Sequence, residues 1–358
     1  MLSTALTALA ADDRFQVSGY APDYRLNALD IQSLAPNLTT LILFSIEPEL
    51  HGGGKLDTHR LSTMHLLRAA RAKRANPHLT ALVAVGGGGR SDGFAEACSS
   101  SKTRQRFATG LAKYVKRGKL DGADLDWEAP ATPQQAADYA ECLKATRAAF
   151  DHIGQGADAQ KLTLSFALHP QHAELLAPAF DHVHRVHLMA YDLPDKSGHA
   201  ALPAALSAAE GLIHAGCPRQ KLALGLPFYG RSLAQPARVA TYAELQSMRE
   251  GPEAGEDGEL PPDDGLLAGF AYDGPQGVAR KVEAAAALGL AGVMVWEVGQ
   301  DARPAGTPGG QLLGALAEAA EASAVGWVPG REDAARLKAA APSRDRWVLK
   351  PARQHDEL

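Results

Sequence analysis

The chain has 358 residues, of which 46% are hydrophobic and 22% are charged, and its formal net charge is -5 at pH 7. This composition is typical of a globular protein, and the length permits one large α/β barrel or two average domains. Lysine and arginine are scattered along the chain, and no apolar run approaches the roughly 20 residues that cross a bilayer. We therefore expect no nucleic acid partner and no membrane span, and a neutral substrate fits better.

The two ends of the chain resemble targeting segments. Residues 1–13 are rich in small and apolar residues and can be read as a short signal sequence, although a positively charged start is missing. Residues 355–358 read HDEL, which at a C-terminus is an address for retention in the endoplasmic reticulum. We therefore expect the lumen of the endoplasmic reticulum, with its retention receptor as a partner, and secretion is the alternative.

Eight apolar and β-branched runs predict strands, and Ala-rich segments of helical character lie between them. Such alternation predicts an α/β fold, a single (β/α)8 TIM barrel over residues 14–322 with a short C-terminal extension over 323–358. The extension is expected to pack loosely. The connection 231–275 contains a stretch rich in glycine, proline and acids, residues 249–265, that is expected to form a mobile surface loop, and the connection is not expected to be a second domain. The predicted strands are 14–24, 38–48, 79–89, 119–128, 161–170, 183–192, 221–230 and 291–300.

The fourth of these runs contains the sequence DGADLDWE, in which acids alternate with apolar residues. Asp124, Asp126 and Glu128 alternate with Leu125 and Trp127, which is the period of an extended strand with two unlike faces. Carboxylates about 6.6 Å apart on one face repel one another, and aspartate is a poor strand former. The pattern therefore indicates a chemical role for the three acids.

Parity places Asp121 on the opposite face, so we expect it to make structural hydrogen bonds in the core. In barrels of this class the catalytic groups lie at the carboxyl ends of the strands. Several polar and aromatic residues besides Glu128 fall at such ends and are expected to meet at one mouth: Tyr20, Glu47, His169, Tyr191, Asp192, Tyr229 and Trp296.

The DGADLDWE run resembles the Asp-x-x-Asp-x-Asp-x-Glu signature of family 18 glycoside hydrolases, the chitinase-like enzymes. Four more segments agree with that family in the same order, and the resemblance covers roughly residues 14–320. They are AVGG (84–87), MAYD (189–192), GLPFYGR (225–231) and GVMVWE (292–297). Two positions depart from the pattern, because Ala84 stands in place of the usual serine and Ala129 in place of the common aromatic residue.

The resemblance implies a mechanism in which the 2-acetamido group of the substrate is the nucleophile. Glu128 would donate the proton to the leaving oxygen, and Asp126 would hold the acetamide N–H and balance the positive charge of the oxazolinium intermediate. Asp124 would share a proton with Asp126, and Tyr191 would donate to the acetamide carbonyl. No metal and no cofactor is expected. The resemblance and the strand ends suggest further substrate-binding residues: Asp192, Trp296, Met189, Tyr20, Phe44, Tyr229 and Arg231.

We therefore expect a retaining hydrolase of β-1,4-linked N-acetylglucosamine, acting on chitin, chitooligosaccharides or the chitobiose core of N-glycans. A lumenal location favours the N-glycan. The first alternative is a chitinase-like lectin that binds such sugars without cutting them. The second is a divalent-metal enzyme or binding module that uses Asp124, Asp126 and Glu128 as oxygen ligands.

Two other patterns receive structural interpretations. His182, His184 and His187 suggest a metal site, but parity directs the first two away from the barrel interior, and structural or surface roles are favoured. The glycine run 86–89 lacks the lysine and the helix context of a phosphate-binding loop. Close approach of the backbone at a strand end explains it better. Cys98, Cys142 and Cys217 lack the paired spacing of a zinc site.

Overall fold

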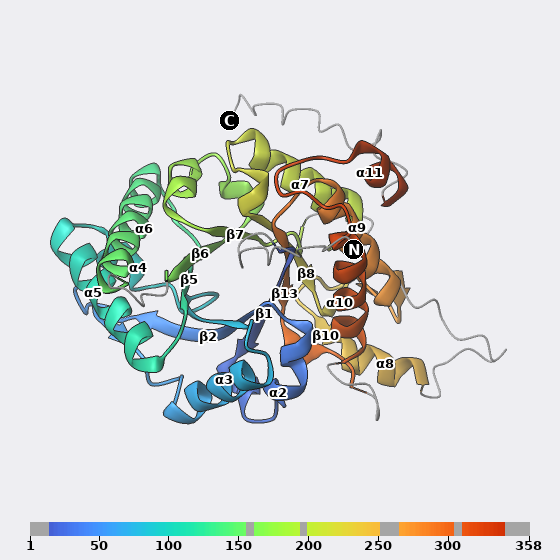
Figure 1. Cartoon of the computed structure of the whole chain (residues 1–358), viewed down its shortest axis with the longest axis horizontal. Coiled ribbons are helices and arrows are strands. Elements are labelled where there is room, and N and C mark those ends of the chain that lie inside the picture. Colours follow the sequence, from blue (N-terminus) through green and yellow to red (C-terminus); the bar gives the residue numbers. More distant parts are fainter. Residues whose placement is uncertain (1–13, 155–160, 194–198, 251–264, 304–309, 341–358) are drawn as a thin grey trace, which may run out of the picture.

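A computed structural model describes residues 14–154, 161–193, 199–250, 265–303 and 310–340 (Figure 1). The two proposed targeting segments, 1–13 and 355–358, lie outside this part of the chain. Within it, eight parallel strands close into a barrel, because β1 pairs with both β13 and β2. Each strand lies inside one of the predicted runs, so the (β/α)8 prediction is confirmed. The strands are β1 (Gln16–Pro22), β2 (Thr40–Pro48), β4 (Thr80–Gly86), β5 (Gly122–Asp126), β6 (Thr163–Leu168), β7 (Arg185–Leu188), β8 (Leu222–Pro227) and β13 (Gly292–Trp296).

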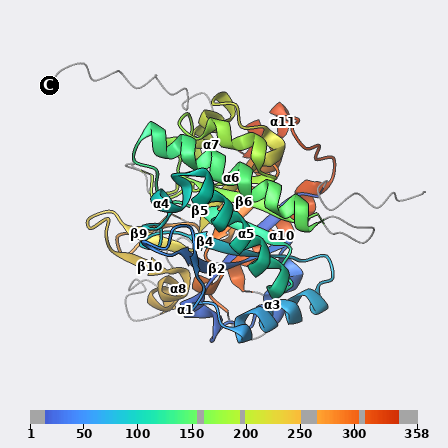
Figure 2. The same ribbon diagram turned by 90° about the vertical axis from the view of Figure 1, so that its left-hand side faces the viewer.

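Helices cover the outside of this barrel (Figures 1 and 2). The longer ones in the described residues are α3 (Thr63–Ala75), α5 (Ser101–Gly118), α6 (Pro133–Ile153), α7 (Leu202–His214), α9 (Pro275–Ala287) and α10 (Gln311–Ala324). Three begin at a hydroxyl that accepts a backbone N–H, as helix starts commonly do: Ser62, Ser100 and Thr132. Short segments join them: α1 (Asp23–Leu26), α2 (Ile31–Leu34), η2 (Ala35–Asn37), β3 (Leu56–Asp57), α4 (Phe94–Cys98), η3 (Pro170–His172), η4 (Ala177–His182), η5 (Arg219–Lys221) and η6 (Val298–Gln300).

The connection from β8 to α9 contains secondary structure that the sequence analysis did not predict. A small antiparallel sheet in the order β10-β9-β12-β11 stands beside the barrel, with the helix α8 (Tyr242–Glu250). Its strands are only three or four residues long, too short to show a period against the surrounding glycine and proline: β9 (Tyr229–Ser232), β10 (Val239–Thr241), β11 (Gly265–Leu267) and β12 (Phe270–Tyr272). Residues 251–264, the acid-rich centre of the connection, lie outside the described residues.

The beginning of the C-terminal extension contacts the barrel layers at a few points, while most of its side chains over residues 325–340 are exposed. Gly330 N–H donates to Gly289 O at 2.8 Å, and the indole of Trp327 meets the ring of Phe15 edge-on at 5.6 Å. The helix α11 (Ala334–Ala340) follows and packs on α9, burying Leu337. Residues 325–340 therefore close the outer layer.

The helices and the cysteines bear on two further properties, membrane-spanning character and disulfide bonding. Among the described helices, none combines the length and the apolar character that crossing a bilayer requires. All three cysteines carry free thiols and are buried.

The carboxylate that precedes β5 ties this strand to the helix layer. Asp121 is buried, accepts the backbone N–H of Ala81 at 2.7 Å and lies 2.6 and 2.7 Å from the ammonium of Lys73 on α3. The structural role predicted for Asp121 is confirmed. Because β5 carries Asp124 and Asp126 and leads directly to Glu128, this ion pair helps to fix the strand that bears the site.

We predict that Lys73→Ala lowers the free energy of unfolding by about 3 kcal/mol, because it leaves a buried carboxylate without its cation. The value lies at the low end for a buried pair, since the Lys73 side chain is 28% exposed. Urea denaturation measures the change. The matched control Lys144→Ala, which breaks an exposed pair with Glu141, should lower stability by less than about 1 kcal/mol. Equal losses in the two variants would contradict the prediction.

Candidate active site

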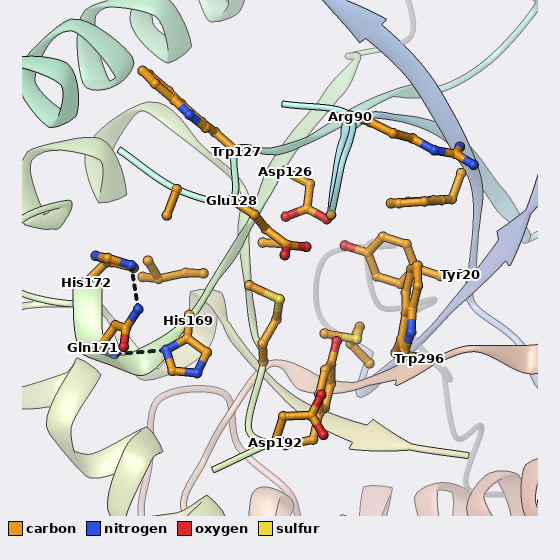
Figure 3. A pocket seen from close by; sticks show the side chains of 18 of the residues that line it. Tyr20, Arg90, Asp126, Trp127, Glu128, His169, Gln171, His172, Asp192 and Trp296 are labelled. Carbon is orange, nitrogen blue, oxygen red and sulfur yellow. Dashed lines mark hydrogen bonds between the residues drawn. The ribbon is translucent and has the colours of Figure 1, made fainter. Parts of the chain in front are cut away.

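A cavity of about 540 Å³ opens where the parallel strands end. Most of the predicted site residues line it (Figure 3), and they come from β1, β2, β5, β9 and β13 and from the segments that follow β5 and β7. These are Tyr20, Phe44, Asp126, Glu128, Met189, Tyr191, Asp192, Tyr229 and Trp296. Asp124, Arg231 and Glu47 are not part of the lining. Glu47 instead forms an ion pair with Arg60.

The alternation in DGADLDWE places its acids and its tryptophan on different sides of the barrel wall. The strand itself ends at Asp126, so Glu128 lies two residues beyond β5 and not at its last position. Trp127 stacks on Phe94, with ring centroids 5.5 Å apart and planes at 12°. The hydroxyl of Ser91 donates to Asp126 O and accepts the N–H of Glu128. The apolar side chain thus anchors the turn that presents the two acids.

The glycine run at the end of β4 makes room for these acids. Gly86 and Gly87 have φ values of +93° and +98°, and a Cβ on Gly87 would lie 2.2 Å from the ring of Phe44. A Cβ on Gly86 would lie 2.4 Å from the carbonyl oxygen of Asp126. Only glycine fits both the backbone conformation and the space. The predicted close approach of the backbone is confirmed.

Asp124 lies beneath the cavity and is surrounded by donors. Its Oδ2 accepts the hydroxyl of Tyr20 at 2.6 Å, and its Oδ1 accepts Ser165 Oγ at 2.5 Å and His187 Nδ1 at 2.9 Å. All four side chains are buried. His187 therefore points into the barrel, whereas His184 accepts the N–H of Leu164 at the start of β6. In the part of the chain described, no three His, Cys, Asp or Glu side chains are grouped to hold a metal ion.

The surroundings of Asp126 and Glu128 both raise the pKa, so each acid keeps its proton to higher pH than usual. Asp126 is fully buried and its Oδ1 has no hydrogen-bond partner among the described residues. Burial, followed by the charges of Glu128 and Asp124, raises the pKa of Asp126 well above its usual value. Glu128 reaches the open cavity, yet partial burial between the walls raises its pKa. The backbone N–H of Gly88 opposes this rise, and the charge of Asp192 adds to it.

The pKa of Asp192 is shifted in the opposite direction, because a guanidinium, an imidazole and a phenol hydroxyl surround this carboxylate. Arg231 contacts both of its oxygens at 2.6 Å, and His199 Nδ1 lies 3.0 Å from Oδ1. Burial would raise the pKa of Asp192, but the hydrogen bonds of His199, Arg231 and Tyr229 and the charge of Arg231 lower it to about 2. Arg231 thus acts on the site through Asp192 and does not line the cavity.

Aromatic rings form the wall of the cavity on the side of β1, β2 and β13. The ring of Trp296 lies edge-on to Phe44 at 4.8 Å and to Tyr20 at 5.6 Å. Arg90, which the sequence analysis missed, lies over the ring of Phe44 at 5.1 Å and is held by Asp23 at 2.7 Å. Because Asp23 is far from Arg90 in the sequence, no local pattern indicated this residue.

The opposite wall is polar and comes from the turn after β6 (Figure 3). His169, Gln171 and His172 line it, and Gln171 Nε2 lies 2.9 Å from His172 Nε2. Burial lowers the pKa of both imidazoles, so they act as neutral hydrogen-bonding groups near neutral pH. His169 was predicted from its place at a strand end, and the other two were missed. Ala129, which also lines the cavity, contributes no ring.

Comparisons with known proteins agree with this architecture. Residues 21–301 match the model of the glycosyl hydrolases family 18. Chitinase 1 of Aphanocladium album is 29% identical over 270 residues, which are 63% of this chain and 62% of that protein. Chitinase A1 of Niallia circulans is 30% identical over 196 residues, 45% of this chain and 28% of that protein. The chain thus spans less than two thirds of the length of these relatives.

Solved structures resemble the fold over most of its length. A GH18 chitinase from Cycas revoluta in complex with (GlcNAc)3 has a TM-score of 0.71 at 22% identity, covering 86% of this chain and 99% of that one. A chitinase-like agglutinin from Robinia pseudoacacia has a TM-score of 0.70 at 24% identity, covering 86% and 98%. Since the family model matches well over half of the chain, this protein belongs to glycosyl hydrolase family 18.

Proposed function

We propose that the protein is a retaining glycosidase that cleaves β-1,4-linked N-acetylglucosamine with the help of the substrate's own acetamide. The observation that carries this proposal is the pair Asp126 and Glu128, in which a buried acid with a free Oδ1 lies beside an acid that reaches the cavity. The other carboxylate that lines the cavity, Asp192, is bound by Arg231 and His199. The acetamide can then take the place of a protein nucleophile.

In this mechanism Glu128 donates its proton to the glycosidic oxygen as the bond to the leaving sugar breaks. The acetamide oxygen attacks the anomeric carbon from the opposite side and forms a cyclic oxazolinium ion. Glu128, now ionised, accepts a proton from the water that opens this ring, which restores the acid. Two inversions at one carbon give net retention.

The neighbours of Glu128 position the acetamide. In the free site Asp126 holds the proton that it shares with Asp124, because three donors face Asp124 and no donor among the described residues faces Asp126 Oδ1. Once this proton has passed to Asp124, the ionised Asp126 accepts the acetamide N–H and offsets the positive charge of the ring. Burial raises the pKa of Tyr191 well above its usual value, which keeps its hydroxyl a donor to the acetamide carbonyl. Trp296 supplies the apolar surface under the sugar.

A lectin is the second candidate, because one similar structure is a chitinase-like agglutinin. Glu128 favours the enzyme, since binding alone does not require a proton donor at the mouth of the cavity. Chitin, chitooligosaccharides and the chitobiose core of N-glycans share the linkage that the site would cleave. Chitotetraose and a high-mannose glycopeptide, incubated side by side with the protein and analysed by mass spectrometry, distinguish among these substrates and the lectin.

We expect chitotetraose to be hydrolysed with the β anomer as the first product, which proton NMR at early times detects. An analogue with a free amine in place of the acetamide at the cleaved unit should not react, because it cannot form the oxazolinium ion. The same analogue with its acetamide restored is the control. An α product, or cleavage of the amine analogue, would refute the substrate-assisted mechanism.

Glu128→Gln should reduce kcat about 10² to 10⁴-fold, the usual contribution of a general acid, while the affinity for chitotetraose stays near that of the parent protein. Steady-state kinetics and calorimetric titration measure the two quantities. Glu141→Gln, an exposed position on α6, serves as the control and should keep full activity. If the unaltered protein binds chitotetraose without cleaving it, the lectin is correct.

Asp192→Asn should move the alkaline limb of the kcat/KM profile to lower pH. The charge of Asp192 raises the pKa of Glu128, so its removal makes Glu128 lose the catalytic proton at a lower pH. Activity depends on the protonated acid and therefore falls as pH rises through that pKa. Asp151→Asn on α6, far from the cavity, should leave the limb in place. An unmoved limb in Asp192→Asn would mean that the two acids are not coupled.

A further inference from the structure

A second hollow, of about 720 Å³, lies along α5. Figure 2 shows α5 on the side of the barrel that faces the viewer. It shares no lining residue with the cavity of the candidate active site. One rim comes from α5 and the other from the chain around β3, which pairs with the end of β2. We call this hollow the α5 groove.

The charge of α5 is unusual for this acidic protein. Its 18 residues contain six lysines and arginines and no aspartate or glutamate, whereas the whole chain has a net charge of -5. The expectation that basic residues are scattered is therefore wrong at this helix. The sequence shows the same cluster, but only the structure shows that a groove lies beside it.

The cations of α5 that line the groove form one row. Lys102, Arg106, Lys113 and Arg117 all lie within about 60° of one another around the helix, given about 100° per residue. The row extends over about 22 Å along the axis, at about 1.5 Å per residue. Lys55 on the opposite rim adds a fifth cation, and among the described residues that line the groove none is acidic.

These five side chains are exposed, and within the described part of the chain none of them forms an ion pair with a carboxylate. Arg117 lies over the ring of Tyr114 at 5.7 Å, which leaves its charge unneutralised. The cation of α5 that does have a carboxylate partner is Arg104, which pairs with Asp138 on α6, away from the groove. The row therefore offers positive charge to a ligand in solution.

The shape of the α5 groove decides which anion fits. A hollow with a row of cations along one rim suits a chain that carries repeated anionic groups. A lipid surface fits less well, because none of the large apolar residues exposed on the described surface lines the groove. Single-stranded nucleic acid also fits less well, because the one ring in the groove, Tyr114, is 5% exposed and offers no face for stacking.

We propose that the α5 groove binds a linear acidic polysaccharide, one that carries carboxylate or sulfate groups. Leu56, Gly110 and the edge of Tyr114 give the groove an apolar floor for the sugar rings, and the five cations meet the anionic groups along the chain. Binding at this site does not require catalysis, so it stands apart from the function proposed for the cavity.

The proposal is tested with fluorescein-labelled dextran sulfate and polygalacturonate, titrated with the full-length protein and followed by fluorescence anisotropy. Both should bind, neutral dextran should not, and affinity should fall steeply between about 50 and about 200 mM salt. The combined variant Lys102→Glu, Arg106→Glu and Lys113→Glu should weaken binding by at least about tenfold. Its kcat/KM for chitotetraose should equal that of the unaltered protein.

The matched control reverses three exposed cations elsewhere, Arg71→Glu, Arg74→Glu and Lys338→Glu, so that net charge changes equally. It should retain most of the affinity. The milder set Lys102→Gln, Arg106→Gln and Lys113→Gln, with circular dichroism as a check of folding, should weaken binding in the same direction. Equal losses in the groove and control variants, unchanged binding in the groove variants, or stronger binding of duplex DNA or phosphatidylserine vesicles would overturn the proposal.

Discussion

The hydrogen bonding of one buried carboxylate organises the centre of the barrel. Asp124 on β5 accepts donors from β1, β6 and β7 through Tyr20, Ser165 and His187. A buried carboxylate is tolerated only when its oxygens accept hydrogen bonds. Loss of a single donor would therefore destabilise the folded state. The same network fixes the strand on which Asp126 lies, one pleat nearer the cavity. The depth and orientation of the acids that face the substrate space follow from this contact.

Much of the fold was accessible from the sequence because its signals are local. The eight strands are apolar runs whose period and length are visible residue by residue, and the acids of β5 stand out for breaking the apolar pattern at every second position. The site residues at strand ends follow from the barrel rule, since parallel strands bring their carboxyl ends to one mouth. Tyr20 and Trp296 meet there although nearly the whole barrel separates them in sequence.

What the sequence did not indicate depends on pairings between distant segments. Arg90 lines the cavity because Asp23 and the ring of Phe44 hold it, and neither partner is near it in the chain. The small sheet after β8 forms from strands of three or four residues, each too short to have a readable period, and its order is set by partners across the sheet. Arg231 was expected in the cleft wall, but the structure uses its charge to hold Asp192.

The attachment of that small sheet has a consequence for how such proteins diverge. Arg231 lies on β9, outside the barrel, and its guanidinium reaches Asp192, which follows β7. The acids proposed to break the bond lie at the end of β5 and just after it, so the inserted sheet reaches the site from the side and adds no side chain to the hydrogen bonds of Asp124 beneath it. A different insertion at this point would therefore alter the surroundings of Asp192 and leave the hydrogen bonds of Asp124 intact. In the proposed mechanism, the side chains that would contact the sugar from the inserted sheet and the acids that would break the bond thus belong to separable parts of the chain.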